Sequence, residues 1–566
     1  MKMTGAEAII QSLRNEEVDV VFGYPGGAVL SLYDALYKAN FNHILTKHEQ
    51  GSVHAADGYA RATGKVGVVI ATSGPGATNL VTGIATAYMD SIPLVAITGQ
   101  VSVPMIGRDS FQEADIRGIT TPITKHNYLV KKVEDLPGAL KEAFYIARTG
   151  RPGPVVVDIA KDVFVALIDY QYPKEVKLRG YHPLFEGDLE TIDKVFEELR
   201  LAHNPLIFVG GGVNLSDSSE ALKVLIEQTG FPVISSLMGL GCVPFDNPQY
   251  LGMVGMHGSY AANMATTECD LLLGIGVRFD DRVTGPTCEF APKAKIIHFD
   301  IDPAEINKNV IANLRVLGDM KWSIPALVQR VEQVSEELKK QVRAWTEKVR
   351  FWQREKPLFY KRDTDNVMPQ AVIEKVSQLT QGEAVIVTDV GQHQMWVAQN
   401  YGFKNPRSFL TSGGLGTMGY GLPAALGAQC GLPDRKVILF VGDGGIMMNC
   451  QELATVADYQ FPVKILILNN QSLGMVAQWQ RLFYGGRYSH TSLKGGHTDF
   501  VKLAEAMGVT GLRVKKPEEL DRVLEQALAT PGPVVVDIQI PETMDALPMV
   551  PSGARLDQMI FGEVDE

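Results

Sequence analysis

The clearest chemical signal in the sequence is a pair of polar residues, Asp443 and Asn470, each of which follows a short apolar run. The runs, at 437–441 and 463–468, flank a helical stretch and so predict a strand–helix–strand unit with parallel strands. Parallel strands end at the same edge of a sheet, so the two side chains are expected to lie close together. Mg²⁺ prefers a carboxylate and a neutral oxygen when phosphate and water complete its shell. The spacing predicts a magnesium–diphosphate site.

Glycines surround the aspartate on both sides, at Gly442, Gly444 and Gly445. Without side chains they let backbone N–H groups approach a phosphate, and the helix that follows directs its positive end to the same place. A Gly-Asp-Gly turn is common, and by itself it is more often a plain turn than a site. The return to Asn470 after a second strand is the feature that favours the diphosphate interpretation.

The elements that must position such a site are indicated by where the 55 glycines fall. Many of them stand where an apolar run ends and a helical pattern begins, as at 20–27, 68–76, 206–212 and 437–444. Short apolar strands that alternate with helical stretches of about 10–15 residues are typical of buried parallel sheets covered by helices. The predicted fold class is therefore α/β, with mainly parallel sheets flanked by helices.

The first and last thirds of the chain resemble each other, which predicts two related domains. The heptapeptide Gly-Pro-Val-Val-Val-Asp-Ile occurs at 153–159 and again at 532–538, and two further pairs of segments correspond in the same order. A different α/β domain lies between these two thirds of the chain. A polar, aperiodic stretch precedes it, and a charged segment follows it. We expect three domains, at 1–170, 190–345 and 366–566.

Composition excludes several classes of protein. The 566 residues are 45% hydrophobic, enough for large cores, and a net charge of −11 without a basic tract argues against nucleic acid or an anionic membrane as partner. The five cysteines form no CxxC pair, which indicates reduced thiols. No apolar run reaches about 18 residues, so no membrane span is expected. A helix pattern that starts at Thr4, with no leader before it, predicts a cytoplasmic protein.

Segments in all three predicted domains resemble thiamine diphosphate enzymes, and among these the acetohydroxyacid synthase family. They are Gly23–Gly27, Lys47–Gly51, Thr72–Asn79, Arg278–Gly285, Gly413–Gly419, the segment around Asp443, and Gly474–Gln480. The resemblance implies that the first domain binds the aminopyrimidine of the cofactor and the third its diphosphate, with the active site between two subunits. It also implies Mg²⁺, held by Asp443, Asn470 and the backbone carbonyl of Ser472.

The resemblance identifies Glu49 as the group that holds a proton at the aminopyrimidine, which then deprotonates the reactive carbon of the cofactor. A carboxyl group with this task needs a dry pocket that raises its pKa, so that it can carry a proton at neutral pH. Small residues follow it, at Gly51, Ala55 and Ala56, and allow close approach of other groups. Without its context, Glu49 would be interpreted as a solvated acid at a helix start.

Further roles follow from the resemblance at matching positions. Met418 supports the bent form of the cofactor, Gln112 lines the reaction pocket, Gly26 leaves room beside the reacting carbon, and Lys161 lies near the substrate channel. Arg282 binds the carboxylate of the second substrate, while Trp479 and Met475, which also contacts the cofactor, form an apolar wall. The ordinary alternatives are core packing for Met418 and Trp479 and a surface position for Lys161.

The central domain raises the expectation of a second cofactor. Its glycine turn at 210–212 lacks the GxGxxG spacing and by itself says little about dinucleotides. The resemblance places FAD contacts at Arg151, from His257 to Arg278, and from Asp300 to Asp319. The segment Arg278–Gly285 favours the FAD-containing branch of the family, in which FAD has no net redox duty.

The implied enzyme removes CO₂ from pyruvate on thiamine diphosphate and joins the two-carbon unit to pyruvate or 2-oxobutyrate. The products are 2-acetolactate or 2-aceto-2-hydroxybutyrate, at the first common step of branched-chain amino acid biosynthesis. A pyruvate oxidase or 2-oxo acid decarboxylase is the alternative, although the first third lacks the His-His pair that decarboxylases use. A non-catalytic scaffold conflicts with the presence of Glu49, Asp443 and Asn470. The family also implies a homodimer or homotetramer and a separate small regulatory subunit.

Overall fold

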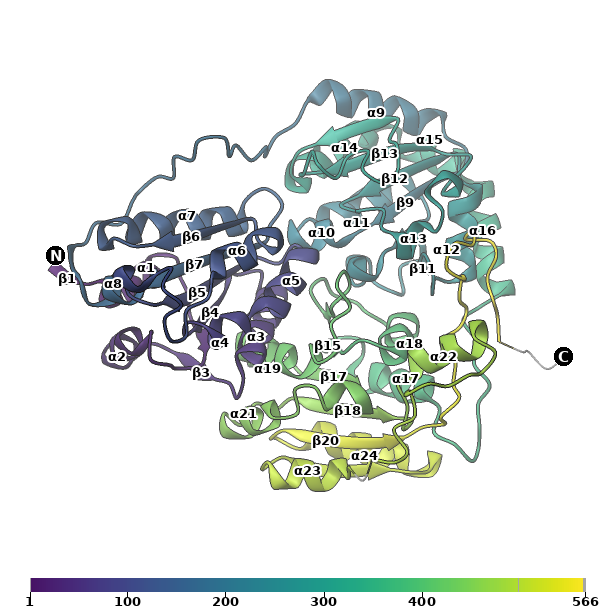
Figure 1. Cartoon of the computed structure of the whole chain (residues 1–566). Coiled ribbons are helices and arrows are strands. Elements are labelled where there is room, and N and C mark those ends of the chain that lie inside the picture. Colours follow the sequence, from purple (N-terminus) through teal and green to yellow (C-terminus); the bar gives the residue numbers. More distant parts are fainter. Residues whose placement is uncertain (1, 497, 563–566) are drawn as a thin grey trace.

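Three parallel sheets, one in each third of the chain, form the framework of the protein. The computed structural model describes residues 2–496 and 498–562. Within them each large sheet has six strands, and a short antiparallel pair joins β1 (Lys2–Thr4) to β8 (Leu167–Asp169). Figure 1 shows the first domain in purple and blue, the central domain in teal, and the third domain in green and yellow. The α/β fold with three parallel sheets flanked by helices is confirmed.

The first and third sheets have the same strand order. The first sheet runs β3 (His43–Leu45), β2 (Val21–Gly23), β4 (Gly67–Ala71), β5 (Leu94–Gln100), β7 (Pro154–Ala160), β6 (His126–Val130). The third runs β16 (Phe409–Leu410), β15 (Val385–Thr388), β17 (Val437–Gly442), β18 (Lys464–Asn469), β20 (Val534–Gln539), β19 (Thr510–Val514). The repeated heptapeptide forms β7 and β20, which occupy equivalent places, as the internal repeat predicts.

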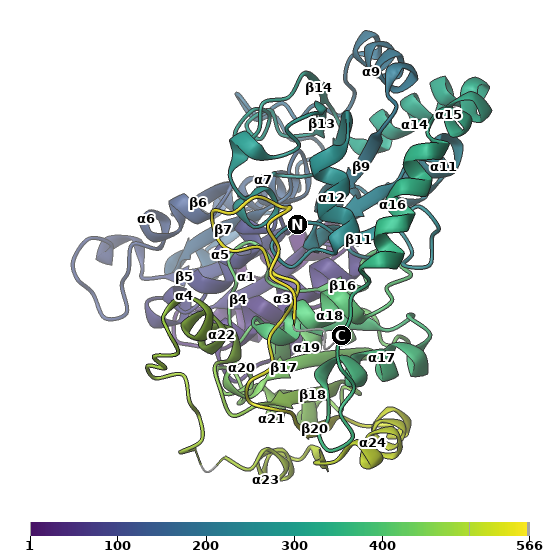
Figure 2. The same ribbon diagram turned by 90° about the vertical axis from the view of Figure 1, so that its right-hand side faces the viewer.

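The central sheet has a different order and lies between the other two in the chain. It runs β11 (Tyr250–Met253), β10 (Val233–Ser235), β9 (Pro205–Val209), β12 (Leu271–Ile275), β13 (Lys295–Asp300), β14 (Leu314–Leu317). Figure 2 shows α16 (Arg343–Glu355) beside this domain, where its buried Trp345 and Val349 join the central core. This helix continues past residue 345, and the exact domain limits stay predictions.

Helices cover both faces of the sheets. In the first domain they are α1 (Gly5–Asn15), α2 (Leu30–Lys38), α3 (Glu49–Thr63), α4 (Pro75–Thr78), α5 (Val81–Met89), α6 (Ile116–Thr120), α7 (Leu136–Arg148) and α8 (Lys161–Val165). The central domain has α9 (Leu189–Leu201), α10 (Gly211–Leu215), α11 (Ser219–Thr229), α12 (Tyr260–Glu268), α13 (Asp281–Thr284), α14 (Met320–Val331), α15 (Ser335–Gln341) and α16. The third has α17 (Pro369–Thr380), α18 (Gln392–Asn400), α19 (Gly421–Gly431), α20 (Asp443–Ile446), α21 (Glu452–Asp458), α22 (Gly474–Phe483), α23 (Phe500–Ala506) and α24 (Pro517–Ala529).

The first and third domains share one hydrophobic core through the helix pair α3 and α19. A Cβ atom added at Gly58 would meet the backbone of Ala424, and one at Gly427 would collide with the backbone of Ala55. Glycine is required at both positions because the two backbones touch there. Of the small residues after Glu49, Ala55 serves the packing of α3 against α19.

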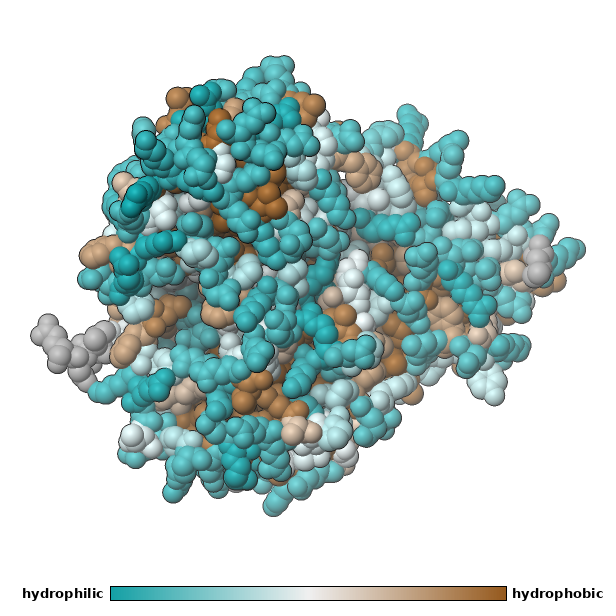
Figure 3. Space-filling model, turned by 180° about the vertical axis from the view of Figure 1, so that it is seen from behind, coloured by the Kyte–Doolittle hydropathy of each residue, from teal (hydrophilic) through white to brown (hydrophobic). Residues whose placement is uncertain are grey.

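Polar residues dominate the face of the molecule opposite to that seen in Figure 1. Figure 3 shows a face on which hydrophilic residues dominate and apolar residues gather in small separate groups. Among the helices of the described part of the chain, none combines the length and the apolar character needed to span a membrane.

Candidate cofactor site

The predicted metal pair meets at the carboxyl edge of the third sheet. Asp443 is the first residue of α20, directly after β17, and Asn470 directly follows β18. The Asp443 carboxylate accepts a hydrogen bond from the Gly444 N–H (3.1 Å) and also faces the N–H groups of Gln471 and Ser472. The Asn470 Oδ1 accepts a hydrogen bond from the Ser472 N–H (3.1 Å). The sequence spacing thus brings both side chains and the Ser472 backbone to one place.

Burial raises the pKa of Asp443 to about 7. A cation beside the carboxylate would favour its ionised form and oppose this rise. The part of the chain described by the structure contains no group of three or more His, Cys, Asp or Glu side chains that could hold a metal. One carboxylate with neutral oxygens fits an ion that shares its shell with phosphate, as Mg²⁺ does.

The glycines around Asp443 form a cradle with little spare room. A Cβ atom at Gly442 would stand 3.2 Å from the His393 Nδ1, and one at Gly445 would stand 2.7 Å from the Asp389 Oδ1. At Gly444 it would meet the Leu473 side chain at 2.6 Å, with the Met418 methyl group at 3.8 Å. Glycine at these positions lets the turn pack against His393, Asp389 and Leu473 and leaves its backbone N–H groups without side chains beside them. Uncovered N–H groups at a helix start fit a diphosphate.

Two residues of this edge, Gln392 and His393, were missed by the sequence reasoning. They begin α18 just after β15, the neighbour of β17 in the sheet, and both are buried. The Gln392 Oε1 and the His393 Nε2 have no hydrogen-bond partner, and burial lowers the pKa of His393 to about 4, so its imidazole is neutral. Buried polar atoms without partners indicate a place for a polar ligand. The available signal was the glycine turn Val390–Gly391 after an apolar strand, the same pattern as at Asp443.

Glu49 lies at the carboxyl edge of the first sheet. It is the first residue of α3, and its Oε2 accepts a hydrogen bond from the Asn79 Nδ2 (3.0 Å). A Cβ atom at Gly76 would stand 3.3 Å from the Glu49 Oε1, and one at Gly26 would stand 2.5 Å from the Thr72 side chain. Glu49 is half-buried in the single chain, and its dry surroundings stay a prediction.

Gln112 and Lys161 belong to the same domain. A Cβ atom at Gly74 would stand 2.8 Å from the Gln112 backbone oxygen, so Gln112 adjoins the loop after β4, and the neighbouring Phe111 is 88% exposed. Lys161 begins α8 directly after β7 and has an exposed side chain. The structure therefore places both residues at the carboxyl ends of strands, and the role of each stays a prediction.

Most of the other predicted residues line one cavity of about 760 Å³. Its lining includes Arg282, Met418, Met475 and Trp479 together with the predicted FAD contacts Arg151, His257, Arg278, Asp300 and Asp319. The Arg282 guanidinium lies over the Trp479 ring, 5.8 Å from its centre, and the buried Trp479 Nε1 has no partner. The cation and the apolar wall predicted for the second substrate thus lie side by side.

The predicted FAD residues have structural partners of their own. The Arg151 Nη1 pairs with the Glu305 Oε1 (2.5 Å), and the Arg278 Nη1 donates to the Met89 carbonyl (2.8 Å). Asp319 caps α14 by accepting from the Lys321 N–H (2.8 Å). Burial raises the pKa of Asp300 to about 7 at the end of β13. The cavity is within the size range of cofactor pockets, which fits the expectation.

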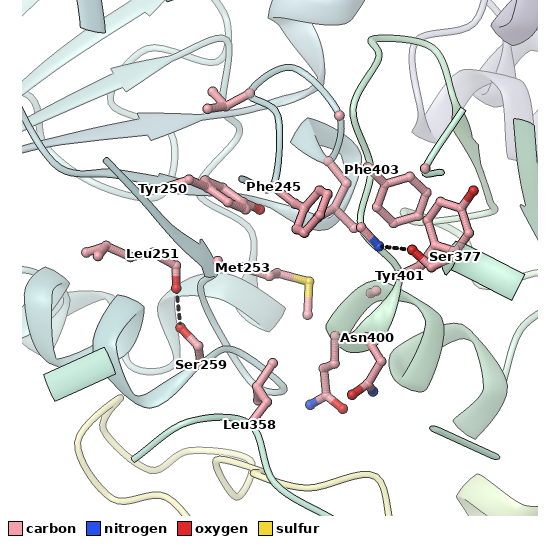
Figure 4. Close-up of a pocket in the computed structure, with 18 of the residues that line it drawn as sticks. Phe245, Tyr250, Leu251, Met253, Ser259, Leu358, Ser377, Asn400, Tyr401 and Phe403 are labelled. Atoms are coloured by element: carbon pink, nitrogen blue, oxygen red, sulfur yellow. Dashed lines mark hydrogen bonds between the residues drawn. The ribbon is translucent and has the colours of Figure 1, made fainter. Parts of the chain in front are cut away.

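A second cavity of about 670 Å³ lies between the central and third domains. Figure 4 shows aromatic rings of Tyr250, Phe245, Tyr401 and Phe403 along its wall, and Ser377 accepting a hydrogen bond. Of the residues predicted for the cofactors and the reaction, its lining contains His257, Ser259 and Ala261, all at the start of the stretch from His257 to Arg278. We assign no part of the predicted chemistry to this cavity.

Comparison with known proteins agrees with this geometry. Family models of the thiamine pyrophosphate enzymes match residues 3–119 (N-terminal TPP binding domain), 192–327 (central domain) and 389–538 (C-terminal TPP binding domain). The acetolactate synthase large subunit of Haemophilus influenzae is 48% identical, covering 100% of this chain and 99% of its own. The probable acetolactate synthase large subunit of Methanocaldococcus jannaschii is 50% identical (99% and 95%), and the isozyme 3 large subunit of Escherichia coli is 46% identical (100% and 99%). The chain therefore belongs to the thiamine pyrophosphate enzymes and, within them, to the family of acetolactate synthase large subunits.

Proposed function

We propose that the protein is an acetolactate synthase. It would remove CO₂ from pyruvate and join the remaining two-carbon unit to pyruvate or 2-oxobutyrate, giving 2-acetolactate or 2-aceto-2-hydroxybutyrate for branched-chain amino acid biosynthesis. The observation that carries the proposal is the edge of the third sheet, where Asp443, Asn470 and the unpartnered atoms of Gln392 and His393 meet. Full-length similarity to acetolactate synthase large subunits supports the choice of reaction.

The residues of the third domain would hold the diphosphate and its ion. Asp443, Asn470 and the Ser472 carbonyl would ligate Mg²⁺, while the His393 imidazole and the glycine N–H groups would donate to phosphate oxygens. The Gln392 Oε1 is an acceptor, and its Nε2 already donates to Gln478 and Met544, so Gln392 would face a donor such as a water molecule. Thiamine diphosphate supplies, when bound, the nucleophilic carbon and the electron sink that decarboxylation requires. The protein's share is to bind, orient and neutralise charge.

The first domain would supply the group that carries the proton. We expect the Glu49 carboxyl to hold a proton at the aminopyrimidine, with the hydrogen bond from Asn79 fixing its orientation. The lack of a side chain at Gly26 would leave room beside the reacting carbon, and Gln112 would border the same space. The family resemblance places the active site between two subunits, so we propose that a second subunit supplies the diphosphate half of each site.

The large cavity would select the second substrate. The Arg282 guanidinium would bind the carboxylate of the incoming 2-oxo acid, and Trp479 with Met475 would contact its alkyl group. An oxidase or a simple decarboxylase needs neither group, because oxygen or a proton takes the place of the second oxo acid. We propose that the remaining part of this cavity, at Arg151, Arg278 and Asp300, binds FAD without a net redox role.

The relatives are named large subunits, a name that implies a separate small subunit. We propose that this chain has such a partner, that it assembles as a homodimer or homotetramer, and that it acts in the cytoplasm. Subunit composition can be measured by size-exclusion chromatography with light scattering.

Turnover of pyruvate, with identification of the product, tests the proposed reaction. The assay is run with all three cofactors and with thiamine diphosphate, Mg²⁺ or FAD left out in turn. We expect 2-acetolactate, formed only when thiamine diphosphate and Mg²⁺ are present. Acetaldehyde as the main product would indicate a decarboxylase, and acetate with consumption of oxygen would indicate an oxidase.

A further inference from the structure

Glu452 of the third domain is a buried carboxylate that binds the first domain. It is the first residue of α21, the helix that follows the turn around Asp443. Its Oε1 accepts hydrogen bonds from the backbone N–H groups of Lys47 (3.0 Å) and His48 (3.1 Å), and its Oε2 accepts one from the Thr455 hydroxyl (2.6 Å). Burial raises its pKa, so the N–H groups are partners that help to keep it ionised.

These two N–H groups stand immediately before Glu49. Lys47 and His48 lead into α3, whose first residue is Glu49, and the His48 Nδ1 accepts a hydrogen bond from the Gln50 N–H (3.0 Å). Glu452 therefore fixes the backbone on one side of Glu49, and His48 fixes it on the other. The direction of the Glu49 side chain toward Asn79 depends on this short stretch.

The contact is close because α3 has a glycine at the right place. A Cβ atom at Gly51 would collide with the Glu452 Oε1. Weaker contacts surround it: the Leu45 N–H donates to the Tyr459 hydroxyl (2.8 Å), and the Lys47 Nζ pairs with the Asp458 Oδ2 (2.6 Å) at the surface. Figure 1 shows α21 next to the chain that follows β3. An exposed ion pair contributes little, so the buried Glu452 is the principal anchor.

We propose that Glu452 is a positioning residue for Glu49. By holding the backbone of Lys47 and His48 it sets the first turn of α3, and so the place where the Glu49 carboxyl meets the cofactor. The inference rests on the proposed function, because it assumes that Glu49 carries the proton that activates thiamine diphosphate. A misplacement of about 1 Å in a catalytic group can reduce a rate about 10²-fold.

Exchange of the proton on C2 of bound thiamine diphosphate for deuterium tests the proposal, because it measures cofactor activation alone. The holoenzyme, saturated with thiamine diphosphate and Mg²⁺, is mixed with D₂O, quenched with acid and analysed by NMR. We expect Glu452→Ala to slow exchange about 10²-fold and Glu452→Gln, which keeps one acceptor oxygen, about 10-fold. Glu49→Gln should slow it about 10²–10⁴-fold.

Two further variants separate positioning from general damage. Gly51→Ala pushes the Glu452 carboxylate away without removing any charged group, and we expect slower exchange here as well. The control, Glu16→Gln, alters a different buried carboxylate, which lies in the first domain and pairs with Lys141 (2.8 Å) and Arg148 (2.6 Å). We expect normal exchange in this variant even if its unfolding temperature falls.

The outcomes distinguish the inference from the proposed function. Normal exchange in Glu452→Ala and Gly51→Ala, with slow exchange in Glu49→Gln, would overturn the positioning role and leave the function intact. Normal exchange in Glu49→Gln would instead remove the assumption about Glu49. Slowing in Glu16→Gln equal to that in Glu452→Gln would show general damage and would also overturn the proposal. If Glu452→Ala does not fold, Gly51→Ala decides between these outcomes.

Discussion

Two aspartates, Asp158 in the first domain and Asp537 in the third, occupy the same place in the two related sheets. Asp158 pairs with Thr98 across β5 and β7, and Asp537 pairs with Ile467 across β18 and β20. Each accepts a hydrogen bond from an amide at the end of the neighbouring strand, from the Gln100 Nε2 (3.0 Å) or the Asn469 Nδ2 (2.9 Å). The repeat therefore extends from the heptapeptide to its hydrogen bonds.

The charges around the two aspartates differ. Asp537 also accepts from the Arg513 Nε (3.0 Å), whereas Asp158 has the Thr98 hydroxyl (2.7 Å), and burial raises its pKa to about 7. The residues that follow two equivalent strands also differ in charge, since the neutral Thr72 follows β4 but the acidic Asp443 follows β17. The two sheets thus share one topology, and the residue types at the carboxyl edge of each sheet decide which half of the cofactor that edge suits.

The two domains also hold each other's loops. Asp90, after α5, accepts hydrogen bonds from the N–H groups of Gly413 (3.0 Å) and Gly414 (2.7 Å), in the loop that leads to Met418. Glu452 does the same for the loop that leads to Glu49. In each domain, the loop that leads to the predicted site residue is therefore held by a buried carboxylate from the other domain.

Removing Glu49, the proposed proton carrier of the first domain, should have the largest effect. Glu49→Gln keeps the size of the side chain but cannot exchange a proton, so we expect pyruvate turnover to fall about 10²–10⁴-fold. Steady-state assays at saturating thiamine diphosphate and Mg²⁺ measure this. The cofactor should still bind, and turnover near that of the unchanged protein would refute the role of Glu49.

Altering the metal edge of the third domain should raise the cofactor requirement. Asp443→Ala or Asn470→Ala should increase the half-saturating concentrations of Mg²⁺ and thiamine diphosphate together, by at least about 10-fold, because in our proposal one ion would join the diphosphate to both residues. Thr72→Ala changes the equivalent strand end of the first domain and should leave the Mg²⁺ requirement unchanged. If all three variants had the same half-saturating concentration of Mg²⁺, the cation would have to bind elsewhere.

The choice of second substrate should depend on Trp479. One methylene in an apolar pocket is worth about 1–3 kcal/mol, so 2-oxobutyrate should exceed pyruvate as acceptor by about 10–200-fold at most. Trp479→Leu should remove most of this preference while acetolactate still forms from pyruvate. A competition assay with both oxo acids measures the product ratio, and an unchanged ratio would contradict the assignment.

The smallest effect concerns the paired aspartates. The folded-state pKa of Asp158, about 7, lies above its ordinary value of 3.8, so its folded form holds a proton that the unfolded chain has lost. Stability contributed by this proton falls as pH rises from about 4 to 7. Asp158→Asn cannot titrate, so its loss of unfolding free energy, about 1 kcal/mol at pH 5, should disappear or become a gain by pH 8.

Asp537→Asn is the matched variant in the third domain. It removes a carboxylate from Arg513, so we expect a loss of about 1–3 kcal/mol that stays similar from pH 5 to pH 8. Urea unfolding at both pH values compares the two variants. The same pH dependence in both would show that the difference in charge around the aspartates is without consequence.

Much of the third domain could be predicted from the sequence. The strand–helix–strand spacing placed Asp443 beside the loop of Asn470, because two parallel strands that follow each other in the chain are usually neighbours in the sheet. The exact repeat of seven residues predicted the equivalence of β7 and β20. Gln392 and His393 escaped because their strand, β15, is separated from Asp443 by about 50 residues of chain, and adjacency in a sheet is not a local property.

Contacts between domains could not be predicted at all. Glu452 and Lys47 are 405 residues apart in the chain, and Asp90 and Gly413 are 323 apart, so neither pattern nor spacing relates them. The surroundings of Glu49 could not be predicted for the same reason, because they depend on how domains and subunits meet. Resemblance to a family supplied its role, whereas the residues near it in sequence only indicated a helix start.

Mixing two inactive variants tests the central claim, that each cofactor site combines Glu49 of one subunit with Asp443 of another. Glu49→Gln and Asp443→Ala chains are unfolded together, refolded and assayed for acetolactate. In a mixed dimer one site keeps both residues and the other loses both, so random pairing predicts recovery of about a quarter of the normal activity. If each site were built within one chain, both sites of every dimer would stay defective. No recovery, from a mixture in which mixed dimers are demonstrated by mass spectrometry, would contradict the account.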